Sequence, residues 1–334
     1  MFSRKKWKRR ESILLLERLE LYISSGLTIN KTLEIIETGL PIKQQTVIRH
    51  IRTQIVSGLP LSRLLTNYIG ISGNIAGLIE QGEQSGKLAQ ALSTGHKLLE
   101  KEDDLYKKCM SALAYPVIIG IFAAGLTLGL IRGVMPQIIP MLKSLNIKLP
   151  LITKVVIFIS ENLITYGVYI ILTLIVGAIV HILLLKKSIG YRKTIHTILI
   201  RIPLIGNLIY TYSLSLFLHS CGVLIESGVS VIHAYTNTSN TVSLLPLSRL
   251  LKLEIQNIHK GIPLGALLMN KSKRIPAYVP SLILAGEASG TLGISLSRAA
   301  AILDRDMEHS LKRLTSLIEP VMMAGMGFVV GGIA

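Results

Sequence analysis

The sequence is poor in residues on which many enzymes and secreted domains depend. Its 334 residues include two cysteines and one tryptophan, and aromatic residues make up only 5%. Cys109 and Cys221 stand alone with no CxxC pattern, so they indicate neither a metal site nor a disulfide framework. Acidic residues are also scarce, at 19 against 36 lysines and arginines. Half of the residues are hydrophobic, a composition that favours a membrane protein over a soluble enzyme.

The chain contains an internal duplication. A pattern between residues 79 and 116 returns between residues 283 and 320, shifted by 204 positions. Four residues of the first copy recur in the second: Gly82, Glu83, Ser85 and Gly86 correspond to Gly286, Glu287, Ser289 and Gly290. Upstream the match continues with shifts smaller by one or two residues, as loop insertions produce. Each copy therefore predicts one domain of about a hundred residues.

Helical periodicity dominates both copies. Apolar residues recur at the three- and four-residue spacing of an amphipathic helix, and no stretch alternates as a half-buried strand does. Gly26, Gly58 and Gly86 follow such periodic segments, where glycine commonly ends a helix. We therefore expect an all-α membrane protein built from two duplicated helical-bundle domains and three transmembrane helices.

Three apolar stretches are long enough to suggest membrane spans, which need about 20 residues each. Charge-free runs cover residues 109–131 and 162–185, and residues 317–334 are apolar except for Glu319. We place the spans at 113–135, 162–185 and 317–334. The first copy then occupies residues 1–112, a short extracytoplasmic linker residues 136–161, and the second copy residues 186–316. The third span is minimal, because 18 helical residues cover about 27 Å.

Small residues and prolines mark the spans. Gly125, Gly129 and Gly133 recur at every fourth position, which predicts a face where another helix packs closely. Two dipeptides stand at span entries: Tyr115-Pro116 opens the first and Glu319-Pro320 opens the third. An acidic residue followed by proline is typical of a helix N-terminus.

Positive charge indicates the orientation. The lysines and arginines divide as 17 in residues 1–115, four in residues 116–185 and 15 in residues 186–334. The positive-inside rule therefore predicts a multi-pass protein of the cytoplasmic membrane, with the N-terminus and both large domains in the cytoplasm. The excess charge fits a surface of anionic lipid. Trp7 among the N-terminal cations fits either a membrane-surface anchor or a solvated tail.

No catalytic pattern is present in the sequence. Residues 82–88 look like a phosphate loop, but that motif needs four residues between its glycines and Ser or Thr after the lysine. None of the eight histidines forms an HExxH motif, and no histidine accompanies the serine in both copies as a shared nucleophile would require. Glu83 and Glu287 leave three interpretations open: helix capping, cation binding and partner contact. We predict no catalytic, cofactor-binding or metal-binding residue.

These features together resemble the type II secretion system F family. The resemblance rests on the paired GExSG turns, on SGLPLSRLL and KGIPLGALL upstream of them, and on the copy endings ALAYP and LIEP. It covers nearly the whole chain, and IPLIG at residues 202–206 looks like the family's entry to its second domain. The short N-terminus and the Ile- and Lys-rich composition look like the competence-pilus branch of Gram-positive bacteria.

The resemblance implies a non-enzymatic platform in the cytoplasmic membrane. Family members present two helical-bundle domains to a hexameric assembly ATPase and couple its motions to the addition and extraction of pilin or pseudopilin subunits. The implied partners are that ATPase, those subunits, anionic lipid and further copies of the chain in a homo-oligomer, and the implied process is type IV pilus assembly, protein secretion or DNA uptake. Two alternatives remain: a small polytopic transporter, and a basic nucleic-acid-binding component, although the cations lack the interleaved aromatics that stack bases.

Overall fold

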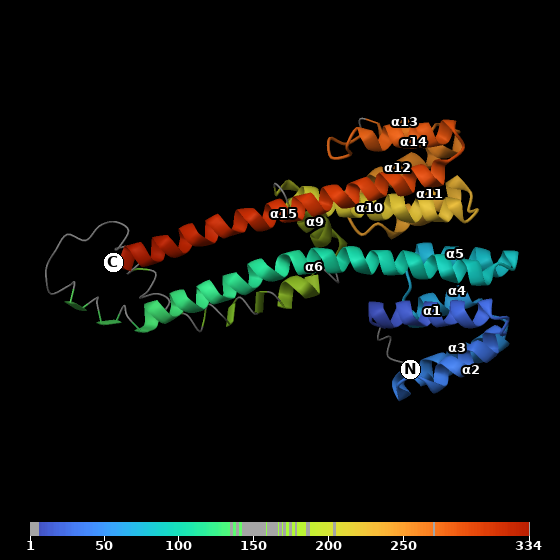
Figure 1. The fold of residues 1–334 in the computed structure, drawn as a ribbon, viewed down its shortest axis with the longest axis horizontal. Helices are drawn as coiled ribbons and strands as arrows, with labels where there is room; N and C mark the ends of the chain where they lie inside the picture. Colours follow the sequence, from blue (N-terminus) through green and yellow to red (C-terminus); the bar gives the residue numbers. More distant parts are fainter. Residues whose placement is uncertain are drawn as a thin grey trace. The chain divides into compact units, whose positions relative to one another are not determined.

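Every regular element in the described part of the chain is a helix (Figure 1). The computed structural model describes residues 7–133, 188–202, 205–269 and 271–333, with scattered residues between 136 and 184. The all-α fold expected from the hydrophobic periodicity is confirmed.

The two copies have the same order of helices. The first comprises α1 (Arg9–Ser24), α2 (Ile29–Thr38), α3 (Ile42–Val56), α4 (Leu61–Leu64), the π-helical turn η1 (Leu65–Ile69), α5 (Gly73–Ser85) and the start of α6 (Leu88–Gly133). The second comprises α10 (Ile205–Glu226), α11 (Val231–Thr241), α12 (Leu245–His259), α13 (Leu264–Leu268), α14 (Tyr278–Ala288) and the start of α15 (Leu292–Ile333). A further helix, α9 (Ile189–Arg201), precedes the second copy.

Left-handed glycines separate these helices at equivalent places in each copy. Gly26, Gly58 and Gly86 have φ values of 86°, 87° and 72°, a region that glycine enters without the steric cost of a Cβ atom. The second copy repeats this with Gly228, Gly261 and Gly290, at φ values of 91°, 79° and 71°. The helix ends predicted just before the first-copy glycines are thus confirmed.

Each copy has its own apolar core. In the first copy, fully buried side chains come from α1, α2, α3 and α5 and include Leu16, Leu33, Ile48 and Ile75. In the second, α10 and α11 contribute Phe217 and Tyr235, whose rings meet edge to face with centroids 5.3 Å apart. Trp7 lies partly buried against the core of the first copy, so its indole packs on protein.

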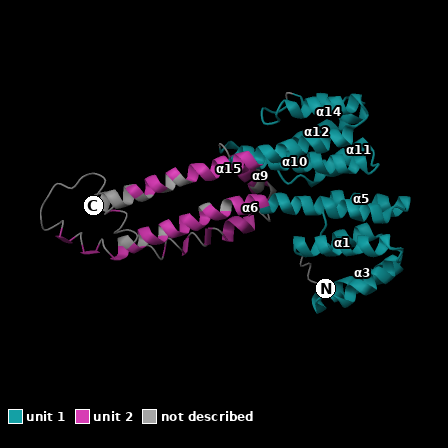
Figure 2. Ribbon diagram, viewed as in Figure 1, with its two compact units in different colours: residues 1–107, 199–307 teal, residues 108–198, 308–334 magenta. Residues whose placement is uncertain are grey.

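The two copies pack into one compact unit, formed by Met1–Lys107 and Leu199–Met307 (Figure 2). Helix α5 lies against α11, and glycines on α5 permit the close approach: a Cβ atom at Gly77 would lie 2.8 Å from Asn237 Nδ2. Leu78 of α5 and Ala91 of α6 belong to the core cluster of the second copy. The copies therefore share buried apolar surface, the main stabilising contribution to such packing.

A second unit contains Lys108–Ile198 and Glu308–Ala334. Its described part includes the C-terminal portions of α6 and α15, where large apolar side chains such as Ile118, Ile121 and Phe122 are exposed. Exposed apolar side chains at helical spacing suit contact with lipid.

The expected helix start at Glu319-Pro320 is wrong, because α15 begins at Leu292 and Pro320 lies inside it. An apolar stripe through Leu296, Leu303 and Leu311 is buried along the preceding turns and stabilises the helix upstream. Proline removes one backbone hydrogen bond, a loss that membrane helices tolerate. Tyr115 and Pro116 likewise lie within α6.

Two described helical stretches are long and apolar enough to cross a bilayer. One is residues 88–127 of α6, whose most apolar window is 7% buried, and the other is α10, whose window is 56% buried. The burial of α10 matches its position in the core of the second copy. The span expected at 162–185 lies largely outside the described residues, and residues 317–333 of the third lie in α15.

Candidate functional site

Glu83, in the last turn of α5, reaches across to the start of α4. Its Oε1 accepts a hydrogen bond from the Leu61 N–H at 2.6 Å, and its Oε2 accepts from the Ser62 N–H at 3.2 Å and the Ser62 hydroxyl at 2.8 Å. Pro60 precedes α4 and offers no side-chain cap. The carboxylate therefore satisfies backbone donors that the first turn of a helix cannot satisfy itself.

Glu287 makes the same contact in the second copy. Its Oε1 accepts from the Leu264 N–H at 2.6 Å and its Oε2 from the Gly265 N–H at 3.1 Å, at the start of α13. Both carboxylate oxygens are thus used within each copy, and the repeated glutamate ties the end of one helix to the beginning of another.

The first glycine of the motif allows α5 to touch α6. A Cβ atom at Gly82 would lie 2.4 Å from Ala91 Cβ, and one at Gly286 would lie 2.4 Å from Ser295 Cβ. Such distances cannot be accommodated without movement of a helix backbone. Glycine is required here for close packing, since both residues are helical and neither has a positive φ.

The repeated serines lie at helix ends. Ser85 is the last residue of α5, and Ser289 is the C-cap of α14. Ser85 Oγ donates to the Gln81 carbonyl at 2.8 Å and Ser289 Oγ to the Ala285 carbonyl at 2.9 Å. The turn itself is formed by the left-handed Gly86 and Gly290.

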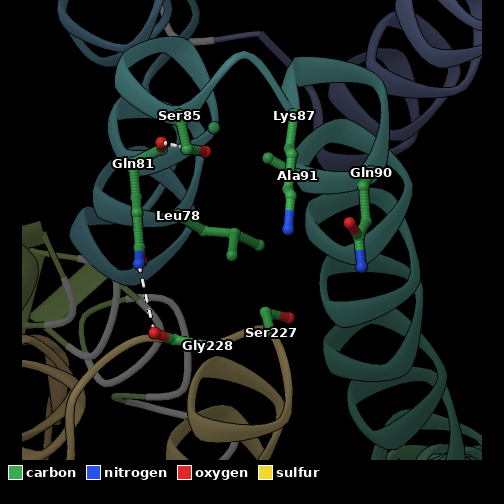
Figure 3. Close-up of a pocket in the computed structure, with 9 residues that line it drawn as sticks. Leu78, Gln81, Ser85, Lys87, Gln90, Ala91, Ser227 and Gly228 are labelled. Carbon is green, nitrogen blue, oxygen red and sulfur yellow. Dashed lines mark hydrogen bonds between the residues drawn. The ribbon is translucent and has the colours of Figure 1, made fainter.

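A pocket of about 150 Å³ adjoins the motif of the first copy (Figure 3). Lys87 and Gln90 extend into it from the beginning of α6, opposite Ser227 and Gly228 of the second copy. Gln81 Nε2 closes one side by donating to the Gly228 carbonyl at 3.3 Å. The pocket is polar, and Lys87, the one cationic residue that lines it, could donate hydrogen bonds to a bound carboxylate.

A charged cluster joins the two copies further along the long helices. Lys101 Nζ on α6 lies 2.8 Å from Asp304 Oδ2 on α15, and Ser215 Oγ donates to the other oxygen of this carboxylate. Asp304 is buried, with 6% of its surface exposed. Burial lowers the pKa of nearby His219, and the Lys101 ammonium lowers it further, while Asp304 and Glu226 oppose this. No motif in the sequence marks Asp304, and its apolar neighbours at helical spacing, such as Ala300, were the available sign of its burial.

A second pocket, of about 210 Å³, lies between the copies and is lined by hydroxyl and charged groups. Asn74 Nδ2 donates to Ser220 Oγ at 3.1 Å, whereas its buried Oδ1 accepts no hydrogen bond from the described residues. Burial raises the pKa of Glu102 in this pocket, and Arg9 and the Asn74 amide oppose the rise. Polar pockets of this size commonly hold ordered water.

Among the described residues, no group of three His, Cys, Asp or Glu side chains is placed to hold a metal ion. No described part of the chain packs against the glycines on the apolar part of α6. A Cβ atom at Gly125, Gly129 or Gly133 would meet no described atom within 4 Å. A packing role for this face remains a prediction.

Tandem helical bundles that lead into apolar helices define a two-repeat, all-α membrane protein. The family model described as "Type II secretion system (T2SS), protein F" matches residues 15–136 and 217–334, one segment in each copy. The chain belongs to the type II secretion system protein F family, which confirms the resemblance seen in the sequence.

Related proteins carry names from two kinds of machine. The chain is 28% identical to "Type IV pilus assembly protein PilC" of Thermus thermophilus, over 94% of this chain and 77% of that protein. It is 25% identical to the protein of the same name in Pseudomonas aeruginosa, over 98% and 88%. It is 24% identical to "Type II secretion system protein F" of Aeromonas hydrophila, over 96% and 82%.

Proposed function

We propose that this chain is the non-enzymatic cytoplasmic-membrane platform of a type IV pilus-like or type II secretion machine. The observation that carries the proposal is the construction of α6 and α15. Each begins in the unit that holds the two joined bundles and continues without a break into an apolar segment. The names of the relatives support the same machine class.

In this proposal, the bundles receive motion from a hexameric assembly ATPase, and the long helices pass it to pilin or pseudopilin subunits in the membrane. The chain would need an external energy source, since its sequence has no phosphate loop. The two bundles could move as one body, because α5 packs on α11 and Lys101 pairs with Asp304 across the copies.

Cross-linking in native membranes tests the partners. The tagged full-length protein is cross-linked mildly, purified and analysed for its companions, with an equally tagged unrelated polytopic protein as the control. Recovery of an assembly ATPase together with pilin-like subunits supports the platform. Recovery of neither, with a bound small solute instead, supports the transporter alternative.

A helix insertion tests the mechanical role of α6. Two glycines inserted after Lys107 should abolish pilus assembly or secretion while leaving membrane insertion and ATPase recovery intact, because each glycine weakens a helix by about 1 kcal/mol. Four inserted alanines serve as the control, because they add about one turn and keep the helix continuous. Full function in the glycine variant would contradict transmission through α6.

Cysteine labelling tests the proposed orientation. In a Cys109→Ser background, Lys43→Cys and Lys260→Cys place exposed thiols on the first and second copies. A membrane-impermeant maleimide should label both only after the membrane is opened, whereas Lys148→Cys in the proposed extracytoplasmic linker should react in intact cells. Labelling of Lys43→Cys in intact cells would overturn the cytoplasmic assignment.

A further inference from the structure

The contact between the two copies is head to tail. The first copy contributes α5 and α6, whereas the second contributes α10, α11 and α15. The copies are equivalent in sequence, but each uses a different surface in this contact. Each copy therefore also has the equivalent of the surface that the other copy uses, and this second surface takes no part in the contact within the chain. A contact of this kind can continue from molecule to molecule, forming a ring if the rotation closes.

If the same contact also forms between molecules, the residues equivalent to the ion pair that joins the copies should carry opposite charges. The pair that joins the copies is Lys101 with Asp304. The shift of 204 residues takes Lys101 to Arg305 and takes Asp304 back to Glu100. The two equivalent positions therefore also carry opposite charges. Both side chains are exposed, and neither forms an ion pair with a described residue.

A second ion pair between the copies also has oppositely charged residues at the equivalent positions. Lys108 Nζ lies 2.6 Å from Glu308 Oε1, and the shift takes these residues to Lys312 and Asp104. These positions again have opposite charges and exposed side chains. From Lys101 to Lys108 on α6, the partner on α15 advances from Asp304 to Glu308, so the paired stretches run in the same direction. Another copy added by this rule would keep its long helices parallel, as a shared membrane requires.

The surface of α5 that meets the second copy also has an exposed equivalent. On α5, Gly73, Gly77 and Gln81 meet the α11 region. Their equivalents are Ala277, which immediately precedes α14, and Ser281 and Ala285 within α14, and all three are exposed.

We propose that full chains associate head to tail, with the second copy of one chain docking on the first copy of another. The exposed face of α14 and α15 would receive α1, α2 and α6 of the second molecule, which are equivalent to α10, α11 and α15, and Arg305 would pair with its Glu100. The occupant of this surface is a second copy of this chain, and the inference does not depend on the proposed function in pilus assembly or secretion.

Disulfide trapping between two differently tagged full-length chains tests the register. One chain carries Glu100→Cys and the other Arg305→Cys, both with Cys109→Ser, while Cys221 is fully buried and is retained. Oxidation in native membranes should give a product that carries both tags and disappears on reduction. Glu80→Cys, an exposed carboxylate position on α5, replaces Glu100→Cys in the control.

Two results would overturn the proposal. One is the absence of the mixed product although both thiols react with a maleimide, and the other is an equal yield in the Glu80→Cys control. Charge exchange provides an independent test in chains that retain their cysteines. Glu100→Arg or Arg305→Glu should each reduce co-purification of the two tagged chains severalfold, because like charges then face each other.

The double variant Glu100→Arg/Arg305→Glu should recover the yield, because it restores opposite charges at each contact. Failure to recover counts against the pairing. If a single reversal does not accumulate in the membrane, the disulfide experiment decides, because it introduces no charge reversal.

Discussion

Lys101 and Asp304 join the two copies of the repeat through an ion pair of 2.8 Å between α6 and α15. The Asp304 carboxylate is buried and also accepts from Ser215, whereas the Lys101 side chain is 36% exposed. Removing the lysine would leave a buried carboxylate with a single neutral donor, and a buried charge without its partner is strongly destabilising.

Lys101→Met should therefore lower the free energy of unfolding by about 1–3 kcal/mol, less than for a fully buried pair because the lysine is partly solvated. Thermal unfolding of the detergent-solubilised protein measures this. Lys97→Met, an exposed lysine on the same helix, is the matched control and should change little. Equal effects of both substitutions would show that the ion pair contributes nothing specific.

The repeated glutamates should behave as structural anchors. Glu83→Gln and Glu287→Gln keep the side-chain shape but replace a carboxylate that accepts two or three hydrogen bonds with a neutral amide. Hydrogen bonds to charged groups contribute about 1.5–3 kcal/mol, so each variant should lose roughly that amount of stability. The loss should be larger at Glu83, which also accepts from the Ser62 hydroxyl.

Glu80→Gln, an exposed position on α5, is the control for the Glu83 variant. Charge reversal at both Glu83 and Glu287 should abolish pilus assembly or secretion together with stable folding. A charge-reversed protein that unfolds normally yet fails in assembly would instead favour a direct partner contact at these residues. Normal assembly by the double reversal would remove both roles.

Close packing at Gly82 predicts a compensating pair of substitutions. Gly82→Ala places a methyl group 2.4 Å from Ala91 Cβ and should destabilise the protein by about 1–3 kcal/mol, because α5 and α6 must separate. Ala91→Gly removes the opposing methyl group and should recover part of that loss, because glycine itself weakens α6 by about 1 kcal/mol and the added Cβ still lies 3.2 Å from the Lys87 carbonyl oxygen. Gly120→Ala, where an added Cβ meets no described atom within 4 Å, serves as the control in unfolding measurements.

Much of the fold was predictable because the information is local. Helical periodicity and the glycines that follow helices, such as Gly58 and Gly86, specify most helix boundaries of the first copy. The duplication also identified Glu83 and Glu287 as equivalent residues. Their hydrogen-bond partners, such as Leu61, could not be read from spacing, because contacts 22 residues apart depend on how α4 and α5 pack.

Tertiary context explains what sequence reasoning missed or misplaced. Lys101 and Asp304 are separated by about two hundred residues, so their pairing requires knowledge of how the copies stack. Pro320 suggested a helix start, but the buried stripe upstream extends α15 through it. A local signal of a helix boundary does not decide the structure where a long buried apolar face favours a continuous helix.

Half-buried His219 predicts how stability should depend on pH. Burial lowers its pKa below the ordinary value, and Lys101 on α6 acts in the same direction, while Asp304 on α15 and Glu226 on its own helix oppose it.

The unfolded chain, with a histidine pKa of about 6.5, therefore binds more protons than the folded chain between the two pKa values. The contribution of the neutral histidine to the free energy of unfolding is complete above the pKa of the unfolded chain. It is lost as the pH falls toward the pKa of the folded chain. Unfolding should consequently become easier as the pH falls through about 6.5, and His219→Gln should flatten that dependence. His259→Gln, at an exposed position, should keep the wild-type profile, and a profile that His219→Gln leaves unchanged would assign the pH sensitivity to another group.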